Sequence, residues 1–177
     1  AGHGGDELGA IGCLGDKEKD INLAIAQKLK QLLENSGAKV IMTRDSDIAV
    51  SLNDRVKISK DNDADIFVSI HNNAFPDSAA MSKRSGSGVY YFYPQSRKLA
   101  EDIQTSLVDE LKMNDDKVHQ ESFAVVRNTD SIAVLVEVGY MINPEDNSKL
   151  VSPEFQEKTA KAILHGMENY INDIQKR

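Results

Sequence analysis

The stretch ADIFVSIHNNA, residues 64–74, decides the fold of this chain, together with IAVLVEVGYMINPED at residues 132–146. Each contains a short apolar run rich in β-branched residues and flanked by polar turns, which predicts a strand buried on both faces. In an open sheet of such strands, ligands bind in the crevice beyond the carboxyl ends. His71 and Glu137 stand at or just past those predicted ends. The two stretches therefore predict a parallel sheet and the edge at which a site would form.

Helical and strand patterns alternate around these two strands. Helices are predicted by apolar spacing, by cap residues such as Ser152 before Pro153, and by stop signals, at residues 18–35, 51–60, 99–111, 144–150 and 153–174. Further strands are predicted at 38–43, 89–93 and, more weakly, 123–126, and a loop at 72–88. The alternation predicts an α/β fold with a mainly parallel central sheet flanked by helices on both faces, a three-layer sandwich.

The opening residues Gly2-His3-Gly4-Gly5 read as a strand-exit loop, although no apolar run precedes them. We therefore expect the first strand of the sheet to be missing ahead of residue 1. The absence of an initiator Met also predicts a fragment or a processed product. At 177 residues, with 40% hydrophobic and 28% charged residues, the chain fits one domain with a substantial core, residues 1–177.

Composition excludes several classes of protein. No apolar stretch approaches the roughly 20 residues that a membrane span needs. A formal net charge of -7 and a pI near 5.1 argue against a nucleic-acid partner, because phosphate binding relies on clustered Lys and Arg. Attachment to an acidic polymer would therefore need local contacts or a separate binding module outside this chain. The single Cys13 forbids an internal disulfide and leaves the redox compartment open.

Three residues of metal-ligating type, His3, Glu18 and His71, stand where a strand is predicted to give way to a loop or helix. A catalytic zinc ion takes three protein ligands and keeps a fourth position for water, whose pKa it lowers from 15.7 to about 7. Two histidines and one glutamate supply such a set. Glu137 ends an apolar strand, where an ionisable side chain is costly to bury without purpose, so it is the natural general base and later acid.

Each of these residues also has an ordinary structural reading. An isolated loop histidine such as His3 is more often a surface hydrogen-bonding residue than a ligand, and His71 could cap its strand. Glu18 could be a solvated first-turn acid favoured by the helix dipole. His119 and His165 lack comparable surroundings, and neither Ser69 nor Cys13 has a context that identifies an activating base.

The same segments resemble the zinc-dependent N-acetylmuramoyl-L-alanine amidases of bacterial cell-wall turnover. The resemblance spans essentially the whole chain and is carried by GHGG with His3, GDKEKDINLAIA with Glu18, TRDSD and LNDR, ADIFVSIHNNA with His71, and AVLVEVGYMINPED with Glu137. It implies Zn²⁺ held by His3, Glu18 and His71, and catalysis by Glu137. It also implies hydrolysis of the amide between the lactyl group of N-acetylmuramic acid and L-alanine in peptidoglycan, at an extracellular or cell-wall location.

Two features depart from that family's pattern. The strand ahead of GHGG is missing, and MNDDKVHQES at residues 113–122 lacks the glycine expected there, which leaves one rim of the cleft unassigned. Arg127 is a candidate donor to a stem-peptide carboxylate, and an ordinary structural ion pair is at least as good a reading. Two other functions stay open: a different zinc hydrolase, such as a peptidase or deacetylase, and a noncatalytic wall-binding module.

Overall fold

The chain is described here from a computed structural model, which covers residues 1–74, 83–127 and 130–176. The elements in chain order are α1 (Glu18–Asn35), α2 (Leu52–Asp61), β1 (Ile66–Asn73), β2 (Ser87–Tyr91), the short 3-10 helix η2 (Pro94–Ser96), α3 (Arg97–Leu111), β3 (Asp115–Gln120), β4 (Ile132–Tyr140), α4 (Pro144–Leu150) and α5 (Pro153–Gln175).

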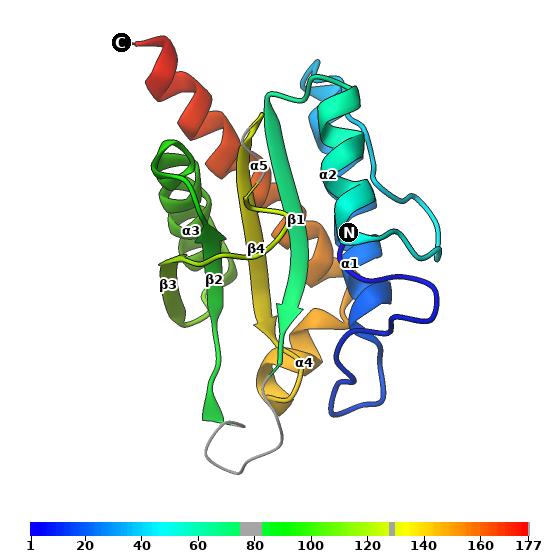
Figure 1. The fold of residues 1–177 in the computed structure, drawn as a ribbon. Coiled ribbons are helices and arrows are strands. Elements are labelled where there is room, and N and C mark those ends of the chain that lie inside the picture. Colours follow the sequence, from blue (N-terminus) through cyan, green and yellow to red (C-terminus); the bar gives the residue numbers. More distant parts are fainter. Residues whose placement is uncertain (75–82, 128–129, 177) are drawn as a thin grey trace.

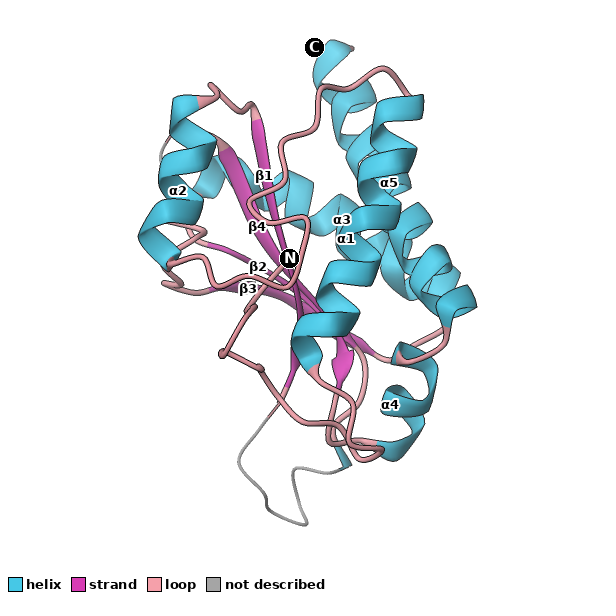
Figure 2. Cartoon of the chain, turned by 90° about the vertical axis from the view of Figure 1, so that its right-hand side faces the viewer, coloured by secondary structure: helices cyan, strands magenta, loops and turns pink. Residues whose placement is uncertain are grey.

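The strands form one four-stranded sheet in the order β1-β4-β2-β3. β1 runs parallel to β4 and β2 parallel to β3, whereas β2 and β4 are antiparallel. Helices α1, α3 and α5 cover one face, and α2 lies on the other (Figures 1 and 2). The predicted α/β fold with a mainly parallel sheet and helices on both faces is confirmed, with one antiparallel pairing inside the sheet.

The side chains of β1 and β4 point alternately to the two faces of the sheet, and they contribute to an apolar core on each face. The larger core lies under α1, α3 and α5, and its fully buried members include Ile25, Leu99, Ile103, Leu107, Val134, Val136 and Ile163. The smaller core lies on the opposite face and contains Phe67, Val125, Val126, Ala133 and Leu135. Because both faces are covered, β1 and β4 are apolar without strict alternation, as their sequences indicated.

The register of β1 on β4 places the two candidate site residues side by side. The pairing runs from Ile66 opposite Ile132 to His71 opposite Glu137. His71 and Glu137 are therefore neighbours across one strand pair, at the carboxyl end predicted for a site.

Two strand predictions were wrong. Residues 38–43 form no strand, because strands require a ladder partner and this segment has none in the described structure. A groove of about 710 Å³, lined by Met42, Ile66, Val68 and Ile70 among others, adjoins it. Residues 123–126 form a turn, in which the Val126 amide donates to the Phe123 carbonyl. The expected strand ahead of residue 1 lies outside the given sequence and stays a prediction.

The other differences concern boundaries and one unassigned segment. The predicted loop at 72–88 is shorter at both ends, because β1 continues to Asn73 and β2 begins at Ser87, and residues 75–82 lie outside the described structure. The segment left unassigned by sequence contains β3, a polar and largely exposed strand. None of the helices in the described ranges has an apolar run suited to crossing a bilayer.

The register shift in the β2–β3 pairing coincides with an exposed residue of β3 whose backbone has a left-handed conformation. Ser87 pairs with Asp115, but Val89 pairs with Val118, so β3 carries one extra residue. Lys117 has a φ of 70°, which favours glycine. The glycine that the family resemblance leads us to expect in residues 113–122 would adopt the left-handed conformation of Lys117 without strain.

Lys117→Gly is expected to raise the free energy of unfolding by up to about 1 kcal/mol, because a left-handed conformation costs an L-residue roughly 1–2 kcal/mol and glycine entropy offsets part of the gain. Chemical denaturation measures the change. Lys39→Gly is the control, since Lys39 is also exposed but has no positive φ, and it should lower stability slightly. A loss of stability in both variants would contradict the expectation.

Candidate metal centre and active site

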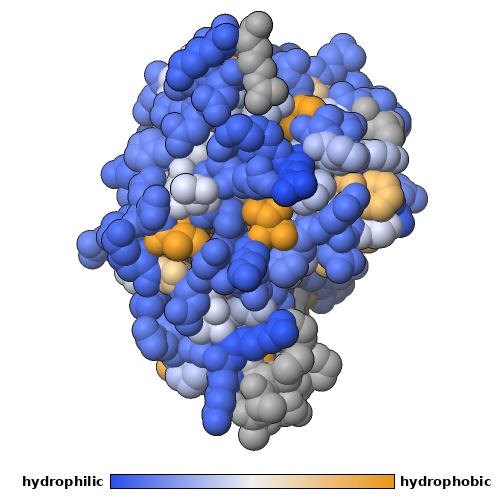
Figure 3. Space-filling view, turned by 90° about the vertical axis from the view of Figure 1, so that its left-hand side faces the viewer, coloured by the Kyte–Doolittle hydropathy of each residue, from blue (hydrophilic) through white to orange (hydrophobic). Residues whose placement is uncertain are grey.

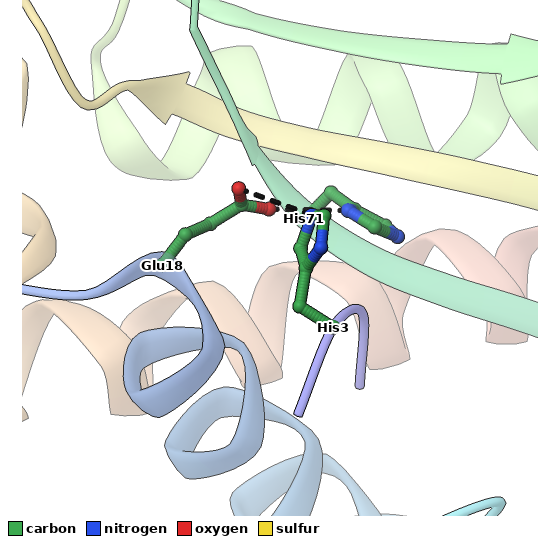
Figure 4. Close-up of side chains that lie close together, drawn as sticks. All are labelled: His3, Glu18 and His71. Carbon is green, nitrogen blue, oxygen red and sulfur yellow. Dashed lines mark hydrogen bonds and ion pairs between the residues drawn. The ribbon is translucent and has the colours of Figure 1, made fainter. Parts of the chain in front are cut away.

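His3, Glu18 and His71 come from three separate elements and converge on one point (Figure 4). His3 lies in the opening loop, Glu18 in the first turn of α1, and His71 near the end of β1. The Nε2 atom of His3 lies 3.2 Å from Glu18 Oε2, and Nδ1 of His71 lies 3.1 Å from Glu18 Oε1. The candidate ligand atoms all lie within 4.8 Å of one another. The sequence-predicted ligand set is thus brought together in space.

Glu18 is the centre of this cluster and is held as a carboxylate. Its oxygens accept hydrogen bonds from the amides of Ala10 and Asn72 and from the side chain of Asn22. Burial alone would raise the pKa of Glu18, but hydrogen bonds from His3 and His71, the charge of His71 and the Ala10 amide together hold its pKa well below the usual range. The residue that was read alternatively as a solvated first-turn acid is instead buried and charged.

The surroundings of His71 favour its neutral form, whereas those of Glu18 favour the charged form. Burial lowers the pKa of His71 despite the hydrogen bond and the charge of Glu18, which both act to raise it. A neutral imidazole has a free nitrogen lone pair, as metal ligation requires.

The donor set fits a zinc ion. Ligand atoms at about 2.1 Å from a tetrahedral ion stand roughly 3.4 Å from one another, and the three candidate ligand atoms lie within 4.8 Å of one another. Two imidazole nitrogens and one carboxylate also match catalytic zinc sites, which use three protein ligands. Asn22 adds an outer layer, because its amide donates to Glu18 and its oxygen accepts from the Asn72 side chain.

Two arginines fix the loop that carries His3. Arg44 donates to the carbonyl of Gly2 at 2.8 Å and to that of Lys19 at 2.8 Å, and Arg55 donates to the carbonyl of His3 at 2.8 Å. Both guanidinium groups also reach the Ala1 carbonyl. The TRDSD and LNDR motifs therefore hold the loop that carries His3 in place, a role that sequence reasoning did not assign to them.

Glycines allow the cluster to close. A Cβ atom on Gly2 would lie 2.1 Å from the His71 ring, so any side chain at this position would displace a candidate ligand. Gly9 has a φ of 68°, and a Cβ atom there would lie 2.5 Å from Glu18 Oε2. The close approach of these loops to the ligands thus depends on residues without side chains.

Glu137 stands next to the cluster and differs from Glu18 in its environment. Its Oε2 atom is buried without a hydrogen-bond partner among the described residues. Burial, the Glu18 charge and the Asp116 charge together raise the pKa of Glu137 well above its ordinary value. A buried carboxyl oxygen without a described partner requires an explanation, and ionisable groups with strongly shifted pKa values are candidates for functional sites.

In the metal-free protein, Glu137→Gln is expected to raise the melting temperature at about pH 8 and to have little effect at about pH 4. The sign follows from the raised folded-state pKa of Glu137. The stability contributed by its protonated form is fully present below the unfolded pKa of about 4.3 and is lost as pH rises through the folded pKa, whereas glutamine stays neutral. Thermal unfolding of both chelator-treated proteins measures this. An equal difference at both pH values would contradict it.

The remaining candidates lie outside the cluster. Arg127 is exposed, and its Nη1 donates to Ser122 Oγ at 3.1 Å. His165 lies on α5 and pairs with Glu110, and His119 lies on β3. Cys13 is exposed and its thiol approaches the Met141 carbonyl.

The fold and the His–Glu–His cluster define an α/β protein with a candidate metal centre at the carboxyl end of the paired strands β1 and β4. A family model for N-acetylmuramoyl-L-alanine amidases matches residues 1–169. The chain therefore belongs to the N-acetylmuramoyl-L-alanine amidase family, which is a family of hydrolases.

Two relatives and one solved structure match nearly the whole of this chain. The Bacillus subtilis protein YqiI, described as uncharacterized, is 40% identical over 174 residues, which are 96% of this chain and 82% of YqiI. The probable cell wall amidase LytH of Staphylococcus saprophyticus is 38% identical over 97% of this chain, which spans 57% of LytH. The structure of the N-acetylmuramoyl-L-alanine amidase AmiC2 of Nostoc punctiforme matches with a TM-score of 0.92 and 35% identity, covering 97% of this chain and 93% of AmiC2.

Proposed function

We propose that this chain is a zinc-dependent hydrolase that cleaves the amide bond between N-acetylmuramic acid and L-alanine in peptidoglycan. The observation that carries the proposal is the convergence of His3, Glu18 and His71 beside Glu137, whose buried carboxyl oxygen has no partner in the part of the chain that the structure describes. Membership of the amidase family supports the choice of substrate.

The four site residues have two separate roles in the proposed reaction, metal binding and proton transfer. His3, Glu18 and His71 would hold the ion, and a bound Zn²⁺ supplies an acidified water molecule and polarises the scissile carbonyl. Glu137 takes the proton of the attacking water and returns it to the departing alanine nitrogen, so one group acts as base and then as acid. The raised pKa of Glu137 suits the second step, because it favours a carboxyl group that can carry a proton. No covalent enzyme intermediate is needed.

Arg127 is proposed to bind a carboxylate of the stem peptide. The turn that carries it packs through Val125 and Val126 on the same small core as Leu135, two residues before Glu137 in β4. Its guanidinium is exposed, and only Nη1 has a protein partner that the structure describes, Ser122. A planar guanidinium with free donors is suited to bidentate carboxylate binding.

Digestion of defined muropeptides tests the function directly. We expect mass analysis to show release of the intact stem peptide with a free L-alanine amine, and a chelator should abolish the release. Cleavage inside the stem peptide would indicate a peptidase, loss of acetyl groups would indicate a deacetylase, and zinc binding without turnover would indicate a noncatalytic module. Full activity after complete metal removal would overturn the zinc dependence.

We further propose that residues 1–177 act as one catalytic domain at an extracellular or cell-wall location, with any wall-binding module outside this chain. One apolar core draws residues from α1, α3, α4 and α5 and from strands β1, β2 and β4, which supports a single folding unit. LytH of Staphylococcus saprophyticus is described as a probable cell wall amidase, which supports the location.

A further inference from the structure

Three aromatic rings gather on the sheet face that carries Glu137. Tyr90 of β2 stacks on His119 of β3, with ring centroids 4.9 Å apart and an interplanar angle of 23°. Phe123 meets Tyr90 edge to face, with centroids 5.4 Å apart at 69°. We call Tyr90, His119 and Phe123 the aromatic shelf. The mechanism proposed above uses none of these three residues.

The aromatic shelf adjoins the catalytic carboxyl group. In the antiparallel pairing of β2 with β4, Gly88 lies opposite Glu137 and Tyr90 lies opposite Leu135, so Tyr90 and Glu137 share one face two positions apart. The side chain of Asn73, at the end of β1, hydrogen-bonds Tyr90, and Glu137 acts electrostatically on the tyrosine. A substrate held against the shelf would therefore have its next group within reach of Glu137.

The outer ring of the shelf is open to a ligand. Phe123 is 43% exposed, although it belongs to a turn whose other apolar residues, Val125 and Val126, are buried against the sheet. Those two valines anchor the turn, so an exposed phenylalanine is not required for that purpose. The molecular surface on the side of α3 and β3 is otherwise largely hydrophilic, with separate apolar patches (Figure 3).

The charges around the shelf select among the parts of a peptidoglycan substrate. Glu137, Asp116 and Glu121 all act electrostatically on Tyr90. The carboxylates of Asp116 and Glu121 disfavour placing a negatively charged group of the substrate on the shelf itself. A neutral N-acetylhexosamine ring has no such penalty, and its C–H faces pack well on aromatic rings, which offer a large rigid apolar area.

We propose that the aromatic shelf is a glycan subsite that binds the face of an N-acetylhexosamine ring and so positions the lactyl amide beside Glu137. This inference rests on the proposed amidase function and adds to it the part of the substrate that is recognised and the residues that recognise it. Phe123 is the residue in direct contact, while Tyr90 and His119 support it.

The test compares two substrates of the same stem peptide, one carrying the N-acetylhexosamine disaccharide and one carrying only the lactyl group. For Phe123→Ala we expect KM to rise on the order of 5-fold for the sugar-bearing substrate and to stay unchanged for the sugar-free one. Phe123→Tyr should behave as wild type, because it keeps the ring. Ile174→Ala, which truncates an exposed apolar residue on α5, is the matched control and should change neither KM.

Equal changes of KM on both substrates, or no change on either, would overturn the proposal. Ligand-observed NMR with a soluble N-acetylglucosamine oligosaccharide provides a readout independent of hydrolysis. Saturation transfer to the sugar ring protons is expected with wild type and with Phe123→Tyr, and should be lost with Phe123→Ala. Transfer that persists in Phe123→Ala would rule out the subsite. An inactive wild type that still shows ring-dependent transfer would overturn the amidase function while leaving the subsite in place.

Discussion

Glu137→Gln is expected to reduce kcat by on the order of 10²- to 10⁴-fold while the protein keeps its metal, because general acid–base catalysis contributes an effect of that size. Glutamine preserves the shape of the side chain but cannot take a proton from water or return it to the alanine nitrogen. Glu137 is also not among the three clustered ligand residues, so metal content should be unaffected.

Steady-state kinetics on a defined muropeptide and elemental analysis of bound zinc measure the two effects separately. Glu145→Gln is the matched control, because this glutamate is exposed on α4 and pairs only with Lys149 in the described structure. It should retain wild-type turnover. A glutamine variant at position 137 with near-normal kcat would remove Glu137 from the mechanism, and loss of zinc in that variant would show that Glu137 is a ligand.

His71→Ala is expected to lose metal and activity together. Removal of a residue that hydrogen-bonds a metal ligand typically lowers metal affinity 10- to 100-fold. Loss of a direct ligand should therefore weaken zinc binding by more than about 100-fold. The loss also leaves Glu18 without one of its two imidazole partners, whereas His3 still contacts it.

Zinc titration and turnover on the same preparations measure both effects. His165→Ala is the matched control, since this histidine is half exposed on α5 and pairs with Glu110 away from the cluster. It should keep wild-type affinity and turnover. Normal zinc affinity in His71→Ala would dismiss the proposed ligand set, and activity restored by excess zinc would show that His71 acts through metal binding alone.

Elements with a strong apolar pattern were predictable from the sequence. β1 and β4 were identified because their β-branched runs are short and bounded by polar turns, and the long helices α1, α3 and α5 because their apolar residues recur at helical spacing. The last helix could also be placed from its start, since Ser152 does accept a hydrogen bond from the Phe155 amide.

Elements that depend on pairing were not predictable in this way. Residues 38–43 have the composition of a strand but no ladder partner in the described structure, and residues 123–126 close into a turn. Conversely, β3 is a polar strand with mostly exposed residues, so it carries no apolar alternation, and only its bonding to β2 makes it a strand.

The residues of the site also fall into those that the sequence indicated and those that it did not. His3, Glu18, His71 and Glu137 could be selected by residue type, by position after predicted elements and by resemblance to the amidase family. Asn22, Asn72, Arg44 and Arg55 were not assigned roles, because their contacts are to main-chain atoms and side chains far away in sequence. A hydrogen bond between distant residues leaves no periodic signal in either segment.

The amino-acid sequence by itself determined the positions of the helices and of β1 and β4, and the kinds of chemical group available at the ends of these two strands, because these follow from local periodicity and residue type. Only the tertiary structure decided that Glu18 is charged and bound by both histidines, that Glu137 has a buried oxygen without a partner among the described residues, and that an aromatic shelf stands beside it. Burial and the proximity of charged groups depend on how segments distant in sequence pack together. They set pKa values and contacts that cannot be read from any one segment.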